Sequence, residues 1–499
     1  MTRDVVLCID VGTGSVRAAA VDLSGRIERI VAREHDQIVP QFGWAEQQAE
    51  AWWDGVAGAT HELVNALPSE RRIVAVAACG QMHGTVLIDT NGKPTRSTVP
   101  LWNDKRTTPL VASFEAQYAP EAYLRDCGNP PTPAWPAFKL AWLRDNDPDA
   151  YARATVVLMP KDFINYRLTG NAAIDPGDAS LSFLMDPRTA TWSAVMIDRL
   201  GLAPEKLPPI RSPLDWLGTV TADAAAQTGV AAGTPVLVGG GDYPMALLGS
   251  GVCRPGIASD VTGTSCIVTV DTRTPILDTG VCNVATIEGN WGSFILFETG
   301  GDAVRWARRA LYANTLDYAG IMAEAATAPA GADGLFFLPF LTGERLGSFR
   351  NARAQFFGLA AAHGRAHLDR AIIEGVAFAG ARALRMMETA AGTAVERVIA
   401  SSGGAKSELW LKIKASAYNI PLLVPAEAEC GIVGCAASAA TALGHYANLD
   451  AAVTHCVRYS HEVVPEPAWA ERYARMQPIF DTLYTRSQAL YGELDRLAE

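Results

Sequence analysis

The sequence predicts two α/β domains in one chain, and three observations lead to this fold class. With 499 residues the chain is too long for a single ordinary core. Short β-branched apolar runs, typical of buried strands, alternate with segments whose apolar residues recur at helical spacing. The motif Asp-Val-Gly-Thr-Gly-Ser at residues 10–15 has a partner, Asp-Val-Thr-Gly-Thr-Ser, at residues 260–265. A period of about 250 residues indicates a duplicated domain.

The first half begins as a β-meander. Residues 5–9 form an apolar run that predicts a buried strand, and further strands are expected at 17–22 and 26–31. A dinucleotide-binding domain would place a helix after the first strand instead. Helical spacing over 46–67 predicts a helix, and 73–79 predicts the next buried strand.

The second half repeats this arrangement after a strand at 235–238 that runs into Gly239-Gly240-Gly241-Asp242. We expect one domain over residues 1–247 and a second over 248–499, with the active site in the cleft between them, because Gly and Pro cluster between 249 and 256. Strands are predicted at 267–270, 294–297, 335–338, 398–401 and 422–424, and helices at 302–312, 367–391, 408–418 and 469–497.

Composition excludes several classes of protein. Hydrophobic residues make up 49% and charged residues 19%, which is typical of a globular protein. The net charge of −11 argues against general nucleic-acid binding. Nine scattered cysteines give no disulfide framework or zinc motif. The N-terminus lacks a signal-like apolar region and no stretch is long enough to span a membrane, so we expect a cytoplasmic protein with no membrane partner.

The two related turns are candidate phosphate sites. Gly12, Thr13, Gly14 and Ser15 follow a strand, and such a turn exposes backbone N–H groups that can hold an anion. A simple hairpin turn is the alternative for this segment alone. Its partner, which contains Gly263 and Thr264, favours a pair of turns that grips a triphosphate, as in the actin/hexokinase-type ATPases. Neither turn has the Walker-A pattern.

Two aspartates are candidates for the chemistry. Asp10 ends the first strand beside the first turn, where its carboxylate could hold Mg²⁺ through water, although a turn-forming role is the alternative. Asp242 follows three glycines that allow a sharp turn, so it is a candidate general base for phosphoryl transfer to a hydroxyl. An ordinary Asx turn is the alternative. Arg17 could add positive charge near the phosphates.

Two further segments follow predicted strands. In Gly80-Gln81-Met82-His83-Gly84, His83 could hydrogen-bond a sugar hydroxyl or carbonyl, although a lone histidine is usually structural. Ser402-Gly403-Gly404 precedes the helix predicted at 408, where bare backbone could face a base or ribose; an ordinary turn is the alternative.

These motifs, in this order, resemble the FGGY family of carbohydrate kinases over nearly the whole chain. The resemblance rests on residues 10–17 and on these further segments: Trp44-Ala45-Glu46-Gln47, Gly80-Gln81-Met82-His83-Gly84, Leu101-Trp102-Asn103-Asp104, Lys139-Leu140-Ala141-Trp142-Leu143, Gly240-Gly241-Asp242, Gly263-Thr264-Ser265 and Gly403-Gly404-Ala405.

The resemblance implies two actin-like (ribonuclease H-like) domains and ATP- and Mg²⁺-dependent phosphorylation of a small sugar or polyol. It assigns the general base to Asp242 and sugar contacts to the residues Met82, His83, Trp102, Asn103, Asp104 and Tyr243. It assigns phosphate contacts to residues 12–17, Gly263 and Thr264, and adenosine contacts to Gly403 and Gly404. A homodimer is common among similar kinases.

One departure concerns the substrate. The Gln-Met-His-Gly segment is similar to xylulokinases, but these typically carry Asn after the catalytic Asp, where this chain has Tyr243. A phenol in place of a small amide shrinks a pocket and changes its donors. We therefore expect a D-xylulose-like ketopentose, with another ketose or polyol such as ribulose or erythritol as the alternative. A sugar-sensing protein without catalytic activity is a further alternative.

Overall fold

The computed structural model describes residues 4–344, 346 and 350–497, and this part of the chain forms two compact units. The N-terminal unit contains the chain up to Cys253 together with Asn283–Gly292 and Glu429–Arg458. The C-terminal unit contains Arg254–Cys282, Ser293–Ala428 and the chain from Tyr459 onward.

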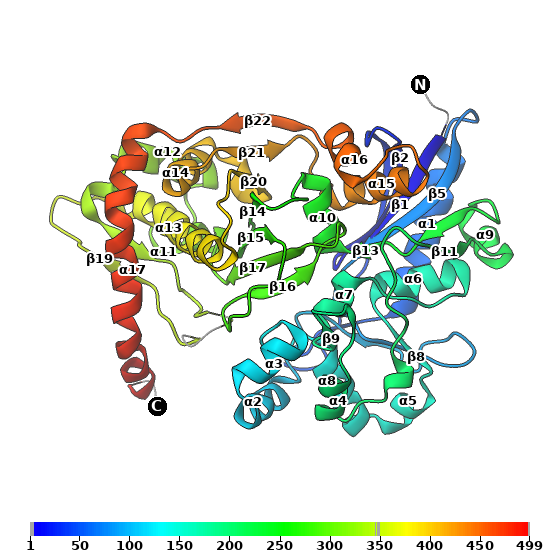
Figure 1. Ribbon diagram of the computed structural model, residues 1–499. Coiled ribbons are helices and arrows are strands. Elements are labelled where there is room, and N and C mark those ends of the chain that lie inside the picture. Colours follow the sequence, from blue (N-terminus) through cyan, green and yellow to red (C-terminus); the bar gives the residue numbers. More distant parts are fainter. Residues whose placement is uncertain (1–3, 345, 347–349, 498–499) are drawn as a thin grey trace. The chain divides into compact units, whose positions relative to one another are not determined.

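A mixed sheet forms the centre of the N-terminal unit (Figure 1). The antiparallel meander predicted at its start is present, and β1 also pairs in parallel with β5. The strand order is β11-β12-β5-β1-β2-β3, with β13 pairing β5 beyond β12. The strands are β1 (Asp4–Val11), β2 (Ser15–Asp22), β3 (Ile27–Glu34), β5 (Arg72–Gly80), β11 (Trp216–Thr219), β12 (Pro235–Leu237) and β13 (Gly240–Gly241).

Both faces of this sheet are buried, which explains the unbroken apolar run of its first strand. Val5, Leu7 and Ile9 point into one core with helix α1 (Ala49–Ala66), whereas Val6 and Cys8 point into another with α15 (Cys430–Ala442). Alternate residues of a strand face opposite sides, so a strand covered on both sides is apolar throughout.

The helix predicted over 46–67 begins later than expected, at Ala49. Glu46 and Gln47 instead form the short strand β4, which pairs with β7 (Val99–Pro100). Both residues are polar but buried. The spacing of apolar residues therefore gives no information about their backbone, which is extended.

The rest of the N-terminal unit is mainly helical. Its strands are β6 (Val86–Ile88), β8 (Val156–Leu158), β9 (Met185–Asp186) and β10 (Thr191–Trp192), and its helices are α2 (Thr108–Gln117), α3 (Pro120–Cys127), α4 (Pro136–Asn146), α5 (Pro148–Arg153), α6 (Pro160–Thr169), α7 (Pro176–Ser180), α8 (Ala194–Arg199), η1 (Pro204–Lys206), α9 (Ala222–Thr228), α10 (Asp242–Ser250) and α16 (Leu449–Cys456).

The C-terminal unit repeats the layout of the first sheet. Its strands follow the order β17-β15-β14-β20-β21-β22, so β17-β15-β14-β20-β21 corresponds to β3-β2-β1-β5-β12. The strand β14 pairs antiparallel with β15 and parallel with β20, as β1 pairs with β2 and β5. These strands are β14 (Ile257–Thr262), β15 (Cys266–Thr272), β17 (Trp291–Phe297), β20 (Arg397–Ser401), β21 (Leu422–Pro425) and β22 (Tyr459–Val463). The strand β16 (Cys282–Ala285) falls mostly in the segment Asn283–Gly292 of the N-terminal unit.

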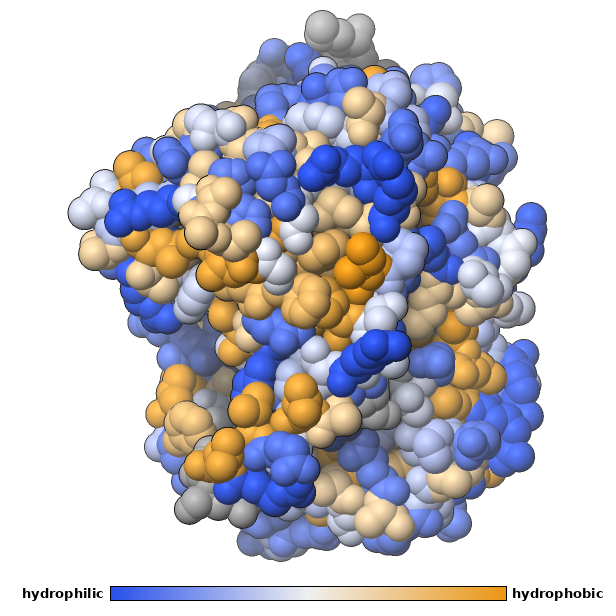
Figure 2. All heavy atoms as spheres, turned by 90° about the vertical axis from the view of Figure 1, so that its left-hand side faces the viewer, coloured by the Kyte–Doolittle hydropathy of each residue, from blue (hydrophilic) through white to orange (hydrophobic). Residues whose placement is uncertain are grey.

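Helix α13 (Arg365–Ala391) is buried along most of its length in the core of the C-terminal unit. The other elements are β18 (Phe336–Leu338), β19 (Gln355–Phe357), α11 (Gly301–Ala310), α12 (Tyr318–Thr327), η2 (Ala332–Gly334), η3 (Gly403–Lys406), α14 (Glu408–Tyr418) and α17 (Pro467–Arg496). Figure 2 views the side on which α17 lies in Figure 1 and shows apolar surface interspersed with polar surface. Among the described residues, no helix has the length and hydropathy to cross a membrane.

Candidate active site

The three glycines before Asp242 form a sharp elbow in the N-terminal unit. Gly239 has a φ of +69°, and a Cβ there would lie 2.2 Å from the Ala78 carbonyl oxygen, so only glycine fits. The next two residues pair with the end of β5 as β13, and Asp242 is the first residue of α10. The elbow thus places a carboxylate at the edge of the sheet where the parallel strands end.

Asp242 and Asp10 lie near each other at this edge. Asp10 pairs with Cys79 across β1 and β5, and Gly240 pairs with the same Cys79 across β5 and β13. Burial, and then the nearby Asp10 carboxylate, raise the pKa of Asp242 to about 7, although the backbone N–H groups at the start of α10 lower it. A carboxyl with a pKa near neutrality suits general base catalysis.

The Asp10 carboxylate is held by a cation from the neighbouring strand. Arg17 donates to Asp10 over 3.1 Å and to Glu429 over 3.0 Å. Burial raises the pKa of Asp10, Arg17 lowers it, and Glu429 raises it. Arg17 is therefore shared between two carboxylates.

The turn between β1 and β2 directs its carbonyl groups into the protein. The carbonyl oxygens of Gly12 and Thr13 contact the Nε2 atoms of His35 and Gln47 at 3.0 and 2.6 Å. The backbone amides of His35 and Gly12 donate to the carbonyls of Gly14 and Ser15. Among the residues that the structure describes, none accepts a hydrogen bond from the amide of Thr13 or Gly14. Unpaired amides on a turn can bind an anion.

The predicted sugar residues Met82 and His83 lie directly after β5, next to the elbow. The Met82 side chain packs against Gly241, the residue before Asp242. His83 has a φ of +70°, which is uncommon for a residue with a side chain. Lys139 Nζ donates to the His83 carbonyl over 2.8 Å, and the His83 ring meets Trp135 edge-on with ring centroids 5.0 Å apart.

Lys139 is buried, and burial lowers its pKa to about 7. The hydrogen bond from this buried lysine to the His83 carbonyl stabilises the uncommon backbone conformation of His83.

The predicted residues at 102–104 have different environments. The Trp102 indole donates to Thr13 Oγ1 over 3.0 Å and is 38% exposed. Asn103 donates to Gln37 over 3.0 Å. Asp104 is 1% exposed, and its carboxylate accepts hydrogen bonds from the backbone of Ala45 and from Arg106. Its sugar contact stays a prediction; its observed contacts fix the surrounding backbone.

A buried charge cluster lies behind the elbow. Lys161 Nζ lies 2.5 Å from Asp162, 2.8 Å from Asp175 and 3.9 Å from Asp178, and all four side chains are buried. The lysine also donates to the Val238 carbonyl over 3.3 Å, just before the elbow. The three carboxylates have the spacing of a metal site, but the ammonium group already supplies a cation among them.

The other predicted nucleotide residues, Gly263, Thr264, Gly403 and Gly404, lie in the C-terminal unit and close to one another. Gly263 and Thr264 form the turn between β14 and β15, whose carbonyls accept hydrogen bonds from the backbone amides of Gly301 and Asp302 at the start of α11. Gly404 packs so closely on Thr262 that a Cβ would lie 2.8 Å from its side chain. Gly403 lies beside it in the same short helix.

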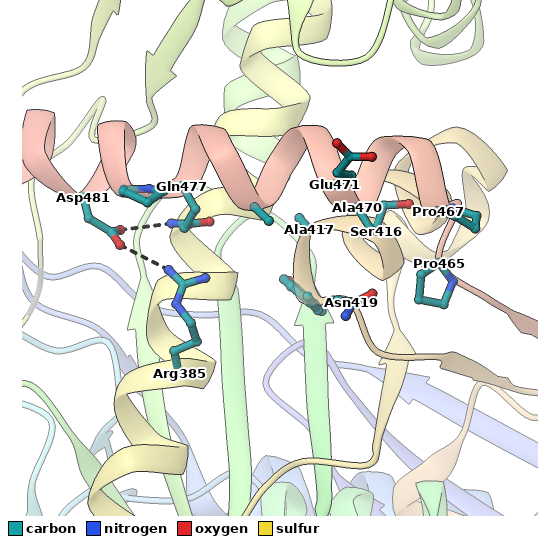
Figure 3. A pocket seen from close by; sticks show the side chains of 13 residues that line it. Arg385, Ser416, Ala417, Asn419, Pro465, Pro467, Ala470, Glu471, Gln477 and Asp481 are labelled. Atoms are coloured by element: carbon teal, nitrogen blue, oxygen red, sulfur yellow. Dashed lines mark hydrogen bonds and ion pairs between the residues drawn. The ribbon is translucent and has the colours of Figure 1, made fainter.

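A cavity of about 710 Å³ in the C-terminal unit contains none of the predicted site residues (Figure 3). Residues of α13, α14 and α17 line it, and Arg385 pairs with Asp481, which also accepts a hydrogen bond from Gln477. The buried Oε1 of Gln477 has less than 1 Å² of accessible area, so it offers nothing to a molecule in the cavity.

Comparison with known proteins identifies the family. Residues 5–249 match the N-terminal domain, and residues 258–443 the C-terminal domain, of the FGGY family of carbohydrate kinases. The chain belongs to the FGGY family of carbohydrate kinases. It is therefore a sugar kinase, a phosphotransferase with ATP as its phosphate donor and an alcohol group as its acceptor.

Relatives of this FGGY kinase match it over nearly its full length. The xylulose kinase of Staphylococcus epidermidis is 26% identical over 99% of both chains, and the autoinducer-2 kinase of Yersinia enterocolitica is 30% identical over 97% of this chain and 94% of its own. The xylulose kinase structure from Rhodospirillum rubrum has a TM-score of 0.92 at 31% identity, and covers 98% of this chain and all of its own. The predicted fold class of two duplicated actin-like domains is confirmed.

Several residues of this site carry no motif of their own that could reveal a role. Glu429 contacts Arg17 from a segment 412 residues later. Gln47 and Lys139 belong to segments that resemble the family, but only their contacts with Thr13 and His83 indicate what they do, and only the contact with Val238 does so for Lys161.

Proposed function

We propose that this kinase transfers the γ-phosphate of ATP to a hydroxyl of a ketopentose, with Asp242 as the general base. The observation that carries this proposal is the Asp242 carboxyl itself. It lies at the end of the parallel strands, beside Met82 and near Asp10, with its pKa raised to about 7. A carboxylate that is partly desolvated binds a proton more strongly than one in water, which favours proton abstraction from an alcohol.

The proposed reaction needs only one proton acceptor. As the sugar oxygen forms a bond to the γ-phosphorus, the bond from that phosphorus to the β,γ-bridging oxygen breaks and ADP leaves. Asp242 takes the hydroxyl proton and later releases it to solvent. A positioned base contributes roughly 10²–10⁴-fold to such a step, and the rest comes from positioning and charge stabilisation.

The phosphate groups of ATP are expected at the two related turns. Support comes from the carbonyl groups of both turns, which the protein engages, and from the amides of Thr13 and Gly14 in the first turn, for which the described residues provide no acceptor. Arg17 adds a positive charge beside the first turn. Adenosine is expected at Gly403 and Gly404, which lie next to the second turn.

Asp10 fits the Mg²⁺ that such kinases typically use. Carboxylate oxygens are the ligands that Mg²⁺ prefers, and a divalent cation held by Asp10 would offset the repulsion that Asp10 exerts on the Asp242 carboxylate. When bound, Mg²⁺ would neutralise charge on the phosphates. The residues of the chain would hold it through water at Asp10.

The relatives and Tyr243 indicate which class of sugar the kinase accepts. Xylulose kinases among the relatives support a D-xylulose-like ketopentose, and the Yersinia relative named autoinducer-2 kinase, 30% identical, supports another small sugar or polyol. Tyr243 follows the proposed base and is expected to contact the substrate, so its phenol should select among these acceptors.

The test is a coupled assay for ADP release with D-xylulose, D-ribulose, other ketoses and four-carbon polyols. We expect one class of acceptor to stimulate ADP release well above the rate without sugar. The variant Asp242→Asn should lower kcat by roughly 10²–10⁴-fold while leaving nucleotide binding intact. Full turnover by this variant would exclude the base, and sugar binding without any ADP release would indicate a sensing protein.

A further inference from the structure

Three side chains in the N-terminal unit form a closed ring of hydrogen bonds. Gln47 Nε2 donates to the Thr13 carbonyl over 2.6 Å. Gln81 Nε2 donates to Gln47 Oε1 over 2.9 Å, and Thr13 Oγ1 donates to Gln81 Oε1 over 3.2 Å. Each of the three residues therefore contacts both others.

The orientation of each amide group in the ring is fixed by its partners. The Thr13 carbonyl only accepts hydrogen bonds, so Gln47 must present its NH₂ group there. The Trp52 indole only donates, and it meets Gln47 Oε1 at 3.0 Å. Gln47 and Gln81 are 1% and 2% exposed, so water cannot substitute for a lost partner without rearrangement.

The ring joins the two motifs that the reaction requires. Thr13 lies in the turn that we assign to phosphate, and its hydroxyl also accepts the hydrogen bond from Trp102. Gln81 immediately precedes Met82 and His83, and its backbone amide donates to the Val11 carbonyl over 2.8 Å. Gln47 comes from β4, which belongs to neither motif.

We propose that Gln47 is a positioning residue that couples the phosphate-binding turn to the sugar-binding segment 80–84. Because the hydrogen bonds of the ring join buried side chains to the turn, movement of the turn upon binding phosphate would shift Gln81 or break a buried hydrogen bond. Sugar and nucleotide therefore each strengthen the binding of the other. This inference rests on the proposed function, since it needs both ligands.

The experiment measures this coupling directly. Calorimetry gives the Kd of the non-hydrolysable β,γ-imido analogue of ATP with and without saturating D-xylulose, or the ketose most active in the ADP-release panel. We expect the sugar to lower the Kd of the unmodified protein by a factor within the roughly 5–150-fold range of typical couplings. The analogue must lower the Kd of the sugar by the same factor, which provides an internal check.

Gln47→Met removes the ring while keeping the size of the side chain, and should bring this factor close to one. Gln47→Glu keeps the acceptor for Gln81 but loses the donor to Thr13, so it should act in the same direction even if the methionine variant folds poorly. Thr13→Ser keeps the hydroxyl and should retain the coupling.

Gln227→Met is the control for loss of an indole hydrogen bond at an exposed position. Gln227 accepts the indole hydrogen bond of Trp53 at 2.8 Å, as Gln47 does for Trp52, but it contacts neither motif. We expect this variant to keep the full coupling factor.

The outcomes separate this inference from the proposed function. Absence of ADP release with every sugar would overturn the proposed function, and the coupling with it. An active kinase whose coupling factor is one, or is unchanged in both Gln47 variants, would overturn only the role of Gln47. Equal loss in the Gln227 and Gln47 variants would also overturn it, because the effect would then be a general loss of packing.

Discussion

The two related turns have the same sequence pattern but are held in different ways. In the N-terminal unit, the side chains of His35, Gln47 and Gln81 bind the turn at residues 12–15. In the C-terminal unit, the backbone amides at the start of α11 bind the turn at Gly263 and Thr264. Side chains that hold a turn can also contact another site, and a substitution can remove that connection. Backbone amides at the start of a helix hold a turn in a way that a side-chain substitution leaves unchanged.

The aspartate that ends the strand before each turn shows the same contrast. Asp260 is buried and accepts hydrogen bonds from Lys414, Thr262 and Tyr418, at distances of 2.6–2.7 Å. The pKa of Asp260 is lowered despite burial, chiefly because of Lys414, whereas the pKa of Asp10 is raised. One of the two carboxylates is therefore held by three side chains of its own unit, whereas the other is held by Arg17, which it shares with Glu429.

The largest expected effect comes from breaking the structural carboxylate. Asp260→Asn leaves the Lys414 ammonium group, whose side chain is 4% exposed, without its charge partner. Removing one member of a buried ion pair typically costs about 3–5 kcal/mol. Urea unfolding followed by circular dichroism should show this loss of stability, and an unchanged midpoint would contradict the structural role.

The matched substitution at Asp10 should affect catalysis instead. Asp10→Asn removes a carboxylate whose ionised form is disfavoured by burial, so the unfolding midpoint should stay the same or rise slightly at pH 8. We expect kcat to fall by about 10²-fold, because the carboxylate proposed for Mg²⁺ is lost. Steady-state kinetics across a Mg²⁺ titration checks this, and full activity at low Mg²⁺ would remove Asp10 from the proposed metal site.

The smallest expected effects are changes in the pH dependence of activity and stability, which should differ between Asp242 and Asp260. Because the proposed base Asp242 has a pKa of about 7, kcat/KM should rise about tenfold per pH unit below 7 and level off above it. The raised pKa means that the folded protein keeps a proton which the unfolded chain has lost, so this group lowers stability as pH rises from about 4 to 7.

Asp260 has the opposite sign. Its lowered pKa stabilises the fold above the ordinary value of 3.8, and this contribution is lost as pH falls through the folded value. Unfolding midpoints should be measured from pH 3 to 8. In Asp260→Asn, part of the decline in stability at acid pH should disappear. In Asp242→Asn, part of the decline between pH 4 and 7 should disappear. The same pH profile in both variants would contradict the contrast.

The strands and helices that were predicted from the sequence depend on local patterns, but no element between residues 80 and 234 was among them. The apolar run at 5–9 and the glycines at 239–241 predict a buried strand and an elbow whatever surrounds them. The start of α1 could not be predicted, because Glu46 and Gln47 are extended through their pairing with β7 and not through any local preference.

The sequence by itself therefore determined the α/β class, the duplication and the aspartates worth testing. Only the tertiary structure decided which of the two related aspartates pairs with a lysine, that Glu429 contacts Arg17, and that Gln47 contacts the first turn. The physical reason is that periodicity and turn chemistry act over a few residues, whereas the charge and hydrogen-bond partners of a buried group come from segments that may lie hundreds of residues away along the chain.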